Sequence, residues 1–291
     1  MQHNQSVKSD RRSSHASVWP ASIDCDFQRT STGKTALVGL SHQGPLRVQK
    51  LFHDGDLAHC YVLHPPGGMV SGDSLQSRFR VDQGAKVLIT TPASGKLYKA
   101  RKNEMLQTAS TNIEVSRDAF CAHLPQDTIV FDKAFGELEA FVNVAATATF
   151  VGWEHLIFGR RAGGYPFENG QLTQSLRISR EGRQLFRENL RLTRQTLQAV
   201  SGLNRMISFA SVTLVLPTSF SHTSDVVSIA RELLQYFDVH AGVSAVRKCM
   251  ITCRILSSVE EETKSALEQL WTTIGLELMG RRVSSPRIWR T

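Results

Sequence analysis

The segment from residue 64 to residue 73, His-Pro-Pro-Gly-Gly-Met-Val-Ser-Gly-Asp, constrains the fold of this chain more than any other stretch. Its adjacent prolines fix the backbone and remove two amide donors, and its three glycines then restore backbone freedom. Proteins use this combination where a chain turns sharply or where another backbone comes close. The residues before the segment are β-rich, and Leu75, Phe79 and Val81 alternate with polar residues after it. We therefore predict a corner between two strands, which on local chemistry alone is a structural feature.

The rest of the pattern predicts a mainly β chain. Gly, Pro, Asn and Asp separate the strand-like runs at spacings too short for helical crossovers, which excludes a βαβ design. The expected strands cover residues 36–40, 46–52, 59–63, 75–81, 86–91, 112–116, 119–124, 139–150, 172–179, 183–192, 206–216 and 242–256.

Helices are expected only late in the chain. Apolar residues recur at helical spacing over 226–237, and a second helix is expected to begin at a capping box of Ser258 and Glu261 and to end near Gly280. A length of 291 residues with 41% hydrophobic content allows a large core. The expected organisation is a disordered tail over 1–22 and one domain over 23–291, made of a β-rich part (35–216), a helix–strand–helix section (224–280) and a basic end (281–291).

Five motifs, taken together and in order, indicate a resemblance to a known family, whereas each motif alone is a weak signal. The corner is followed by a Thr-Thr-Pro segment, a Leu-Pro-Gln-Asp segment, a Gly-Trp-Glu-His strand and a C-terminal Pro-Arg-Ile-Trp. From about Thr35 to its end the chain resembles the family of urease accessory proteins called D, or H in some bacteria. The motif positions are His64, Gly67, Gly68, Gly72, Asp73, Thr91, Pro92, Lys96, Tyr98, Gln126, Phe131, Trp153, Glu154, Gly159 and Arg160.

The resemblance implies stacked, coil-like β layers with a few helices near the C-terminal end. It also implies a non-enzymatic role: a cytoplasmic scaffold that docks on apo-urease with a helical adaptor (F) and a nickel-carrying GTPase (G). It implies no tightly bound cofactor and only transient nickel. The resemblance assigns the GTP chemistry to the partner, and this is consistent with Gly33-Lys34-Thr35, which lacks the glycine that a phosphate loop needs at the position of Gln28.

Scattered carboxylates suit a transient ion path. The candidates are Asp73, Asp132, Glu154 and Glu168; Glu168 is included because Tyr165 stands where the family has an acid. For each of the first three, a side-chain bond that stabilises a turn is a competing interpretation. Cys60 and His64 would share one face of a strand and are the weak metal-ligand candidates, although packing is the favoured interpretation. The five cysteines are scattered, which favours reduced thiols.

The net charge of +8 is partly located in the two ends of the chain. Within the body, seven arginines between residues 177 and 205 stand against Glu181 and Glu188, with Phe186 as the only aromatic residue. Because nucleic-acid sites interleave arginine with aromatics, an acidic protein partner fits better than nucleic acid. A plain solvated face is a competing interpretation, and a basic RNA-binding module is an alternative. The expected partner-binding face is Arg183, Arg187, Arg191 and Arg194. At the basic end, Ile288 and Trp289 are expected to pack against the body or a partner.

A serine hydrolase is the other alternative. Gly72-Asp73-Ser74-Leu75 matches a nucleophile block of one esterase family, but the only Asp-x-x-His pair, Asp56 and His59, precedes Ser74. The chain has no apolar run long enough for a membrane span and no apolar segment typical of a signal peptide, so a cytosolic location is expected.

Overall fold

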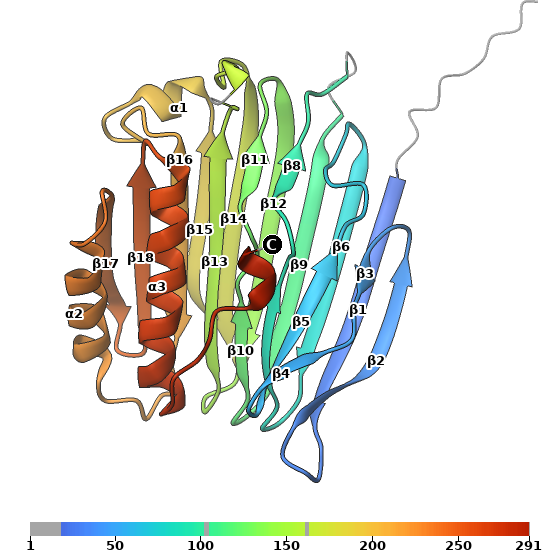
Figure 1. Cartoon of the computed structure of the whole chain (residues 1–291), viewed down its shortest axis with the longest axis vertical. Helices are drawn as coiled ribbons and strands as arrows, with labels where there is room; N and C mark the ends of the chain where they lie inside the picture. The colour runs from blue at the N-terminus through green and yellow to red at the C-terminus, as the bar shows by residue number, and fades with distance from the viewer. Residues whose placement is uncertain (1–18, 102–104, 161–162, 291) are drawn as a thin grey trace, which may run out of the picture.

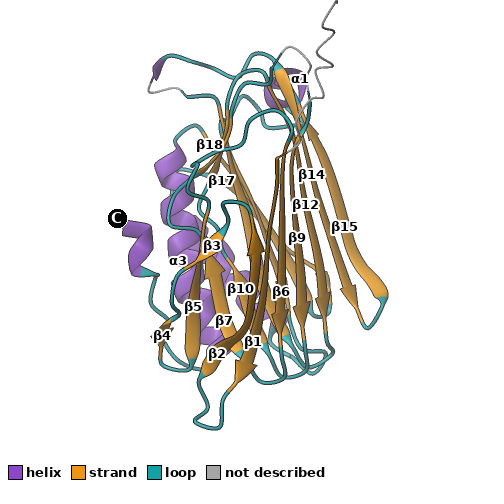
Figure 2. Cartoon of the chain, turned by 90° about the vertical axis from the view of Figure 1, so that its right-hand side faces the viewer, coloured by secondary structure: helices purple, strands orange, loops and turns teal. Residues whose placement is uncertain are grey.

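Two β-sheets lie face to face in this protein. The computed structural model describes residues 19–101, 105–160 and 163–290. Within them, α2 (Thr223–Leu234) and α3 (Glu260–Met279) cover the outer face of one sheet, while the outer face of the other is uncovered (Figures 1 and 2). The predicted mainly β class with helices toward the C-terminal end is confirmed. No helix of these residues combines the length and apolarity needed to cross a bilayer.

The first sheet has seven strands, and its inner strands are parallel. Strands β1, β6, β9, β12 and β14 pair in parallel, whereas β2 and β15 pair antiparallel at the two edges. Their spatial order is β15 (Arg183–Leu192), β14 (Gly170–Arg180), β12 (Ala134–Val144), β9 (Gln107–Val115), β6 (Asp73–Val81), β1 (Trp19–Arg29) and β2 (Thr35–Gln43).

The second sheet has eleven strands and carries the helices. Strands β5, β7, β10 and β13 pair in parallel, and antiparallel strands extend the sheet on both sides. The main order is β17 (His240–Arg247), β18 (Met250–Ser257), β16 (Ser208–Val215), β13 (Thr149–Phe158), β10 (Phe120–His123), β7 (Lys86–Thr90), β5 (Leu57–Leu63) and β3 (Arg47–Val48), with β4 (Phe52–Asp54), β8 (Gly95–Leu97) and β11 (Thr128–Val130) beside it.

The chain coils between the two sheets. From β5 to β14 it passes back and forth between the sheets, with β8 following β7 and β11 following β10 within the second sheet. Each pair of parallel neighbours in this part is therefore joined through a strand of the opposite sheet. Parallel strands need a long crossover, which is usually a helix. Here a strand supplies it, which is consistent with the predicted absence of βαβ units and gives the coil-like layering that the resemblance implied.

The core has two layers, because strand residues alternate between two faces. Between the sheets, Phe27 and Phe79 of the first sheet pack with Cys60, Val87 and Phe150 of the second. Outside the second sheet, the opposite face packs against the helices through residues that include Leu88, Trp153, Val212, Ala230, Leu267 and Trp271.

The helices are α1 (Arg194–Gln198), α2 (Thr223–Leu234), α3 (Glu260–Met279) and the 3-10 helix η2 (Arg287–Arg290). The predicted end of α3 is confirmed, because Gly280 caps it at φ 64°. The predicted capping box is wrong: Val259 is the N-cap residue, and the hydroxyl of Ser257 accepts a hydrogen bond from its amide. The short helix α1 was not predicted, and Thr193 caps its N-terminus.

Three predicted strands run across a turn, and the strand predicted over 112–116 begins earlier, at Gln107. Residues 46–52 form β3 and the start of β4, residues 139–150 span the turn between β12 and β13, and residues 242–256 form the hairpin of β17 and β18. In the second case Ala148 donates to the carbonyl of Ala145. Small and apolar residues run through that turn without glycine or proline, so no turn signal is present there.

The N-terminal boundary also needs correction. The predicted tail falls outside the described residues over 1–18, but residues 19–22 begin β1. Ala21, Ile23, Cys25 and Phe27 are buried on the face that meets the second sheet. Their alternation is a period-two signal that the sequence analysis missed.

Candidate functional site

The corner joins the two sheets at one end of the coil. It follows β5 and leads into β6, and Gly67 and Gly72 have φ of 72° and 86°. Gly68 is needed for a different reason: a β-carbon there would lie 2.5 Å from the Tyr98 ring and 3.0 Å from the carbonyl oxygen of Lys96. Both uses of glycine that the sequence predicted, a sharp turn and a close approach, are therefore present.

Other motif positions brace this corner. The amide of Met69 donates to the carbonyl of Lys96 at 2.7 Å, and the amide of Tyr98 donates back to the carbonyl of Met69 at 3.0 Å. Gln107, which is fully buried, donates from Nε2 to the carbonyls of Met69 and Tyr98 at 2.8 and 2.7 Å. Sequence analysis missed Gln107. A glutamine at an inward-facing strand position could have been recognised, because a buried amide needs hydrogen-bond partners.

The remaining motif positions gather at the same end. Thr91 accepts from the amide of Gln126 at 2.9 Å, and the rings of Tyr98 and Phe131 are 5.2 Å apart. Gly159, at φ 83°, donates its amide to Val130. The motifs thus meet in space because parallel strands begin and end together.

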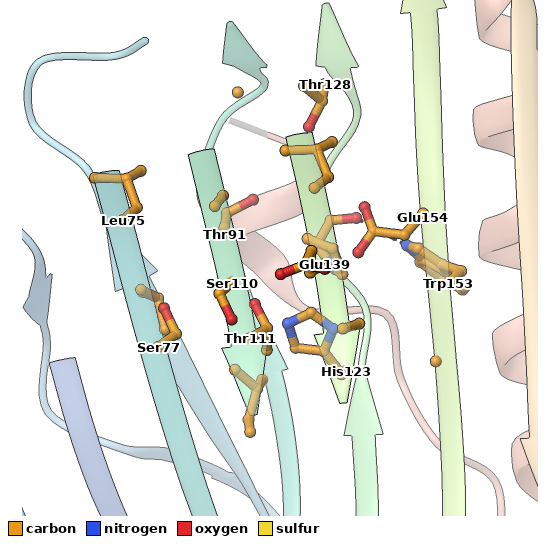
Figure 3. Close-up of a pocket in the computed structure, with 18 of the residues that line it drawn as sticks. Leu75, Ser77, Thr91, Ser110, Thr111, His123, Thr128, Glu139, Trp153 and Glu154 are labelled. Carbon is orange, nitrogen blue, oxygen red and sulfur yellow. Dashed lines mark hydrogen bonds between the residues drawn. The ribbon is translucent and has the colours of Figure 1, made fainter. Parts of the chain in front are cut away.

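A cavity of about 230 Å³ lies between the sheets below this corner. In Figure 3, the Glu154 carboxylate and the His123 ring extend from β13 and β10 into this space. Its other polar lining residues include Ser77, Thr111, Thr128, Gln174, Ser211 and Thr213, beside apolar ones such as Leu75, Leu138 and Trp153. A space of this size and polarity accommodates several water molecules.

The cavity contains groups with shifted proton affinity. Burial raises the pKa of Glu154 to about 7 and lowers the pKa of His123 to about 4. The Oε1 atom of Gln174 is buried and has no hydrogen-bond partner among the described residues. Near neutral pH, Glu154 therefore exchanges between a neutral and a charged state. The lining offers oxygen and imidazole nitrogen atoms that can coordinate a cation.

Only one of the four ion-path candidates lines the cavity. That candidate is Glu154. The carboxylate of Asp73 instead accepts a hydrogen bond from the amide of Val70, so it stabilises the turn, as the competing interpretation predicted. Asp132 accepts from the amides of Glu168 and Asn169, and the carboxylate of Glu168 pairs with Arg194. Tyr165, where the resemblance implied an acid, is 64% exposed. The structure does not bring the four carboxylates together.

Cys60 and His64, the weak metal-ligand candidates, lie in different surroundings. His64 lines the cavity, whereas Cys60 is fully buried beside Cys25 and Cys121 in the core between the sheets. Hydrogen bonding to Cys25 and burial raise the pKa of the Cys60 thiol. Among the described residues no group of three or more His, Cys, Asp or Glu side chains could hold a metal ion.

The hydrolase alternative fails on geometry. Ser74 lies in β6 between Asp73 and Leu75, and Leu75 faces the cavity, so Ser74 points away from it on the uncovered side of the first sheet. His59 is one residue from the inward-facing Cys60 and thus faces the helical side of the second sheet, near Asp54. Asp56 pairs with Lys86 and Arg281. Both sheets separate Ser74 from the predicted Asp-His pair.

The predicted basic face lies on the edge strand of the first sheet and the helix after it. Arg183, Arg187, Arg191 and Arg194 are all exposed. Glu188, counted against them in the sequence, points inward and pairs with Arg254 and Ser211. Phe186 packs into the core. The outward-facing side of β15 is therefore more basic than the strand as a whole. Phe186, the one aromatic residue of the span, is not available for stacking on bases.

Comparison with known proteins covers nearly the whole chain. The family model described as UreD urease accessory protein matches residues 20–290. A urease accessory protein UreD of Methylobacillus flagellatus is 32% identical over 94% of this chain and 95% of its own length. A UreD of a Marinomonas species is 36% identical over 95% of this chain and 91% of its own, and one of Saccharophagus degradans is 33% identical over 94% and 93%.

Proposed function

This chain belongs to the family of UreD urease accessory proteins, and we propose that it is a non-catalytic maturation factor. In this proposal it docks on apo-urease subunits in the cytoplasm, together with the accessory proteins F and G, and helps to deliver nickel to the urease active site. The observation that carries the proposal is the cavity between the two sheets, with Glu154 and His123 in its lining.

The lining suits a cargo ion better than a resident one. Nickel accepts oxygen and imidazole donors, but tight sites require several converging ligands. Here the lining holds two carboxylates (Glu139 and Glu154), two imidazoles (His64 and His123) and the ammonium group of Lys96, but among the described residues no three His, Cys, Asp or Glu side chains converge as a metal site would require. Such a lining would let a hydrated ion enter and leave. The nucleotide chemistry stays with the partner, because Gly33 and Lys34 lie in the hairpin turn between β1 and β2, and Thr35 begins β2.

The variant Glu154→Gln tests this role. When urease subunits and all accessory proteins are co-expressed, we expect it to lower urease activity and nickel content several-fold, because the cavity loses one of the two carboxylates, Glu139 and Glu154, that can neutralise a cation. Folding raises the Glu154 pKa from 4.5 to about 7, so the folded protein holds more protons in that window and its free energy of unfolding falls as pH rises through it. Glu154→Gln should therefore raise the melting temperature at pH 8 and leave it nearly unchanged near pH 4.

That pH-dependent gain in stability separates loss of transfer from loss of folding. Glu114→Gln, on the exposed side of β9, is the matched control and should change neither readout. Full urease activation by Glu154→Gln would contradict the proposed role of the cavity.

The basic face gives a second test, on docking. Reversing Arg187 and Arg191 to Glu should slow association with apo-urease subunits or the helical adaptor on the order of tenfold at low salt, because exposed charges steer encounter and are screened over about 8–10 Å. Surface-captured subunits and a range of salt concentrations give the association rates. The double reversal of Arg29 and Arg117, exposed at the far ends of β1 and β9, changes net charge equally and should have little effect.

The RNA alternative predicts a different outcome for the same variants. Tight, strongly salt-dependent RNA binding that is lost on reversing Arg187 and Arg191, with no capture of urease subunits, would overturn the docking proposal.

A further inference from the structure

A second hollow lies on the surface beside α1, away from the inner cavity. It is a groove of about 330 Å³ between the segment after β13, helix α1 and the turn that leads into β16. Buried apolar side chains form its floor: Phe158, Phe167, Leu197 and Ile207. Exposed or half-buried residues form its rim: Pro166, Glu168, Arg194, Gln198, Arg205 and Met206.

The groove is rigidly built. The rings of Phe158 and Phe167 meet edge to face at 5.5 Å. The turn over 199–206 is held against α1, because the amide of Leu203 donates to Thr196 at 3.1 Å and the amide of Arg205 donates to Leu197 at 2.7 Å. A preformed groove binds with little ordering cost.

The same turn is strained. Asn204 and Arg205 are consecutive non-glycine residues with φ of 48° and 65°. Left-handed backbone costs about 1 kcal/mol or more at such residues and is found at ligand-binding positions more often than elsewhere. This turn therefore holds Arg205 at the rim at the expense of stability.

The charge of the rim indicates what it binds. Arg194 Nη1 already holds the carboxylate of Glu168 at 2.6 Å, with both side chains about half exposed. Arg205 has no carboxylate partner among the described residues, although it lines the same groove. Beside it, Val200 is 85% exposed. The rim thus has one satisfied and one unsatisfied guanidinium above an apolar floor.

We propose that this groove docks a short segment of a partner protein in which apolar side chains lie next to carboxylates. The apolar side chains contact the floor, and the carboxylates pair with Arg205 and, in exchange with Glu168, with Arg194. The floor rings are buried and packed edge to face, so they offer no platform for stacked bases. The inference goes beyond the proposed function, since it names a site and a class of segment independently of nickel.

Fluorescence polarisation with short labelled peptides tests the proposal on the full-length chain. The first probe alternates Leu and Phe with Asp and Glu, the second replaces the acids with Lys, and the third replaces the apolar residues with Ser. Only the first should bind, and more weakly at higher salt. Equal binding of the lysine probe, or no binding of the first probe at high micromolar concentration, would overturn the proposal.

Two variants move the affinity in opposite directions. Arg205→Asn keeps a residue that tolerates the left-handed backbone and should weaken the first probe about tenfold, through loss of a charge-assisted pair. Glu168→Gln should strengthen it, because it releases Arg194; a purely structural role for this ion pair predicts no such gain. Arg117→Asn is the control, and unchanged affinity in Arg205→Asn would refute the site.

The same variants separate this inference from the proposed function. Each is also tested for co-purification with apo-urease subunits. If complexes form normally while no variant alters probe binding, the groove proposal is wrong and the maturation role is untouched.

Discussion

Removing residues 286–291 is expected to destabilise the folded protein by about 3–5 kcal/mol, the usual cost of deleting a buried tryptophan. Trp289 is 7% exposed, and its ring centroid lies 5.5 Å from that of Trp153. Its indole Nε1 donates to the hydroxyl of Thr90 at 2.8 Å, and that hydroxyl in turn donates to the carbonyl of Leu124. The truncation therefore opens a cavity and leaves the Thr90 hydroxyl with one partner fewer. Thermal and urea unfolding measure the effect.

Point variants identify the cause. Trp289→Phe keeps most of the ring packing and should cost only about 1 kcal/mol for the lost hydrogen bond. Arg287→Ala changes an exposed residue of the same short helix and should change little. If the truncated chain unfolds at the same temperature as the full chain, then Trp289 contributes nothing to folding.

This example shows what the sequence could and could not predict. The composition around Ile288 and Trp289 predicted a packed end, and the packing of Trp289 is confirmed. Its contacts with Thr90 and Trp153 were beyond prediction, because they depend on which strands are neighbours in the second sheet. Period-two alternation reports which residues are buried and carries no information about the strand alongside.

The same limit explains the candidate site. Strand existence followed from alternation, but the coiling between sheets came from the family resemblance and not from the pattern. Glu154 was a candidate because of its motif, and it lies in the cavity. Asp73, Asp132 and Glu168 were equally good in sequence, yet local turns and an exposed arginine hold them. Gln107 and Gln174, polar residues on inner faces, carried the signal that sequence analysis overlooked.

The corner gives the second large effect. Gly72→Val is expected to cost about 2 kcal/mol or more, because a β-branched residue at φ 86° is strained. The backbone there has no room to relax: the Gly72 amide donates to the carbonyl of Leu106, and its carbonyl accepts from the amide of Trp19, each at 3.2 Å. These bonds connect the corner to the starts of β9 and β1. Thermal unfolding and soluble yield measure the cost.

A matched glycine separates backbone strain from the general effect of adding a side chain. Gly242 lies on the exposed edge strand β17, outside the left-handed region, with nothing within 4 Å of an added β-carbon. Gly242→Val should therefore stay within about 0.5 kcal/mol of the parent chain. If the two variants melt together, positive φ at Gly72 is not what requires glycine there, and the positive φ of Gly67 and the close approach at Gly68 would have to explain the glycine-rich corner. If Gly72→Val alone is destabilised, the corner fixes how the two sheets meet above the cavity, because the strands that it joins line that cavity.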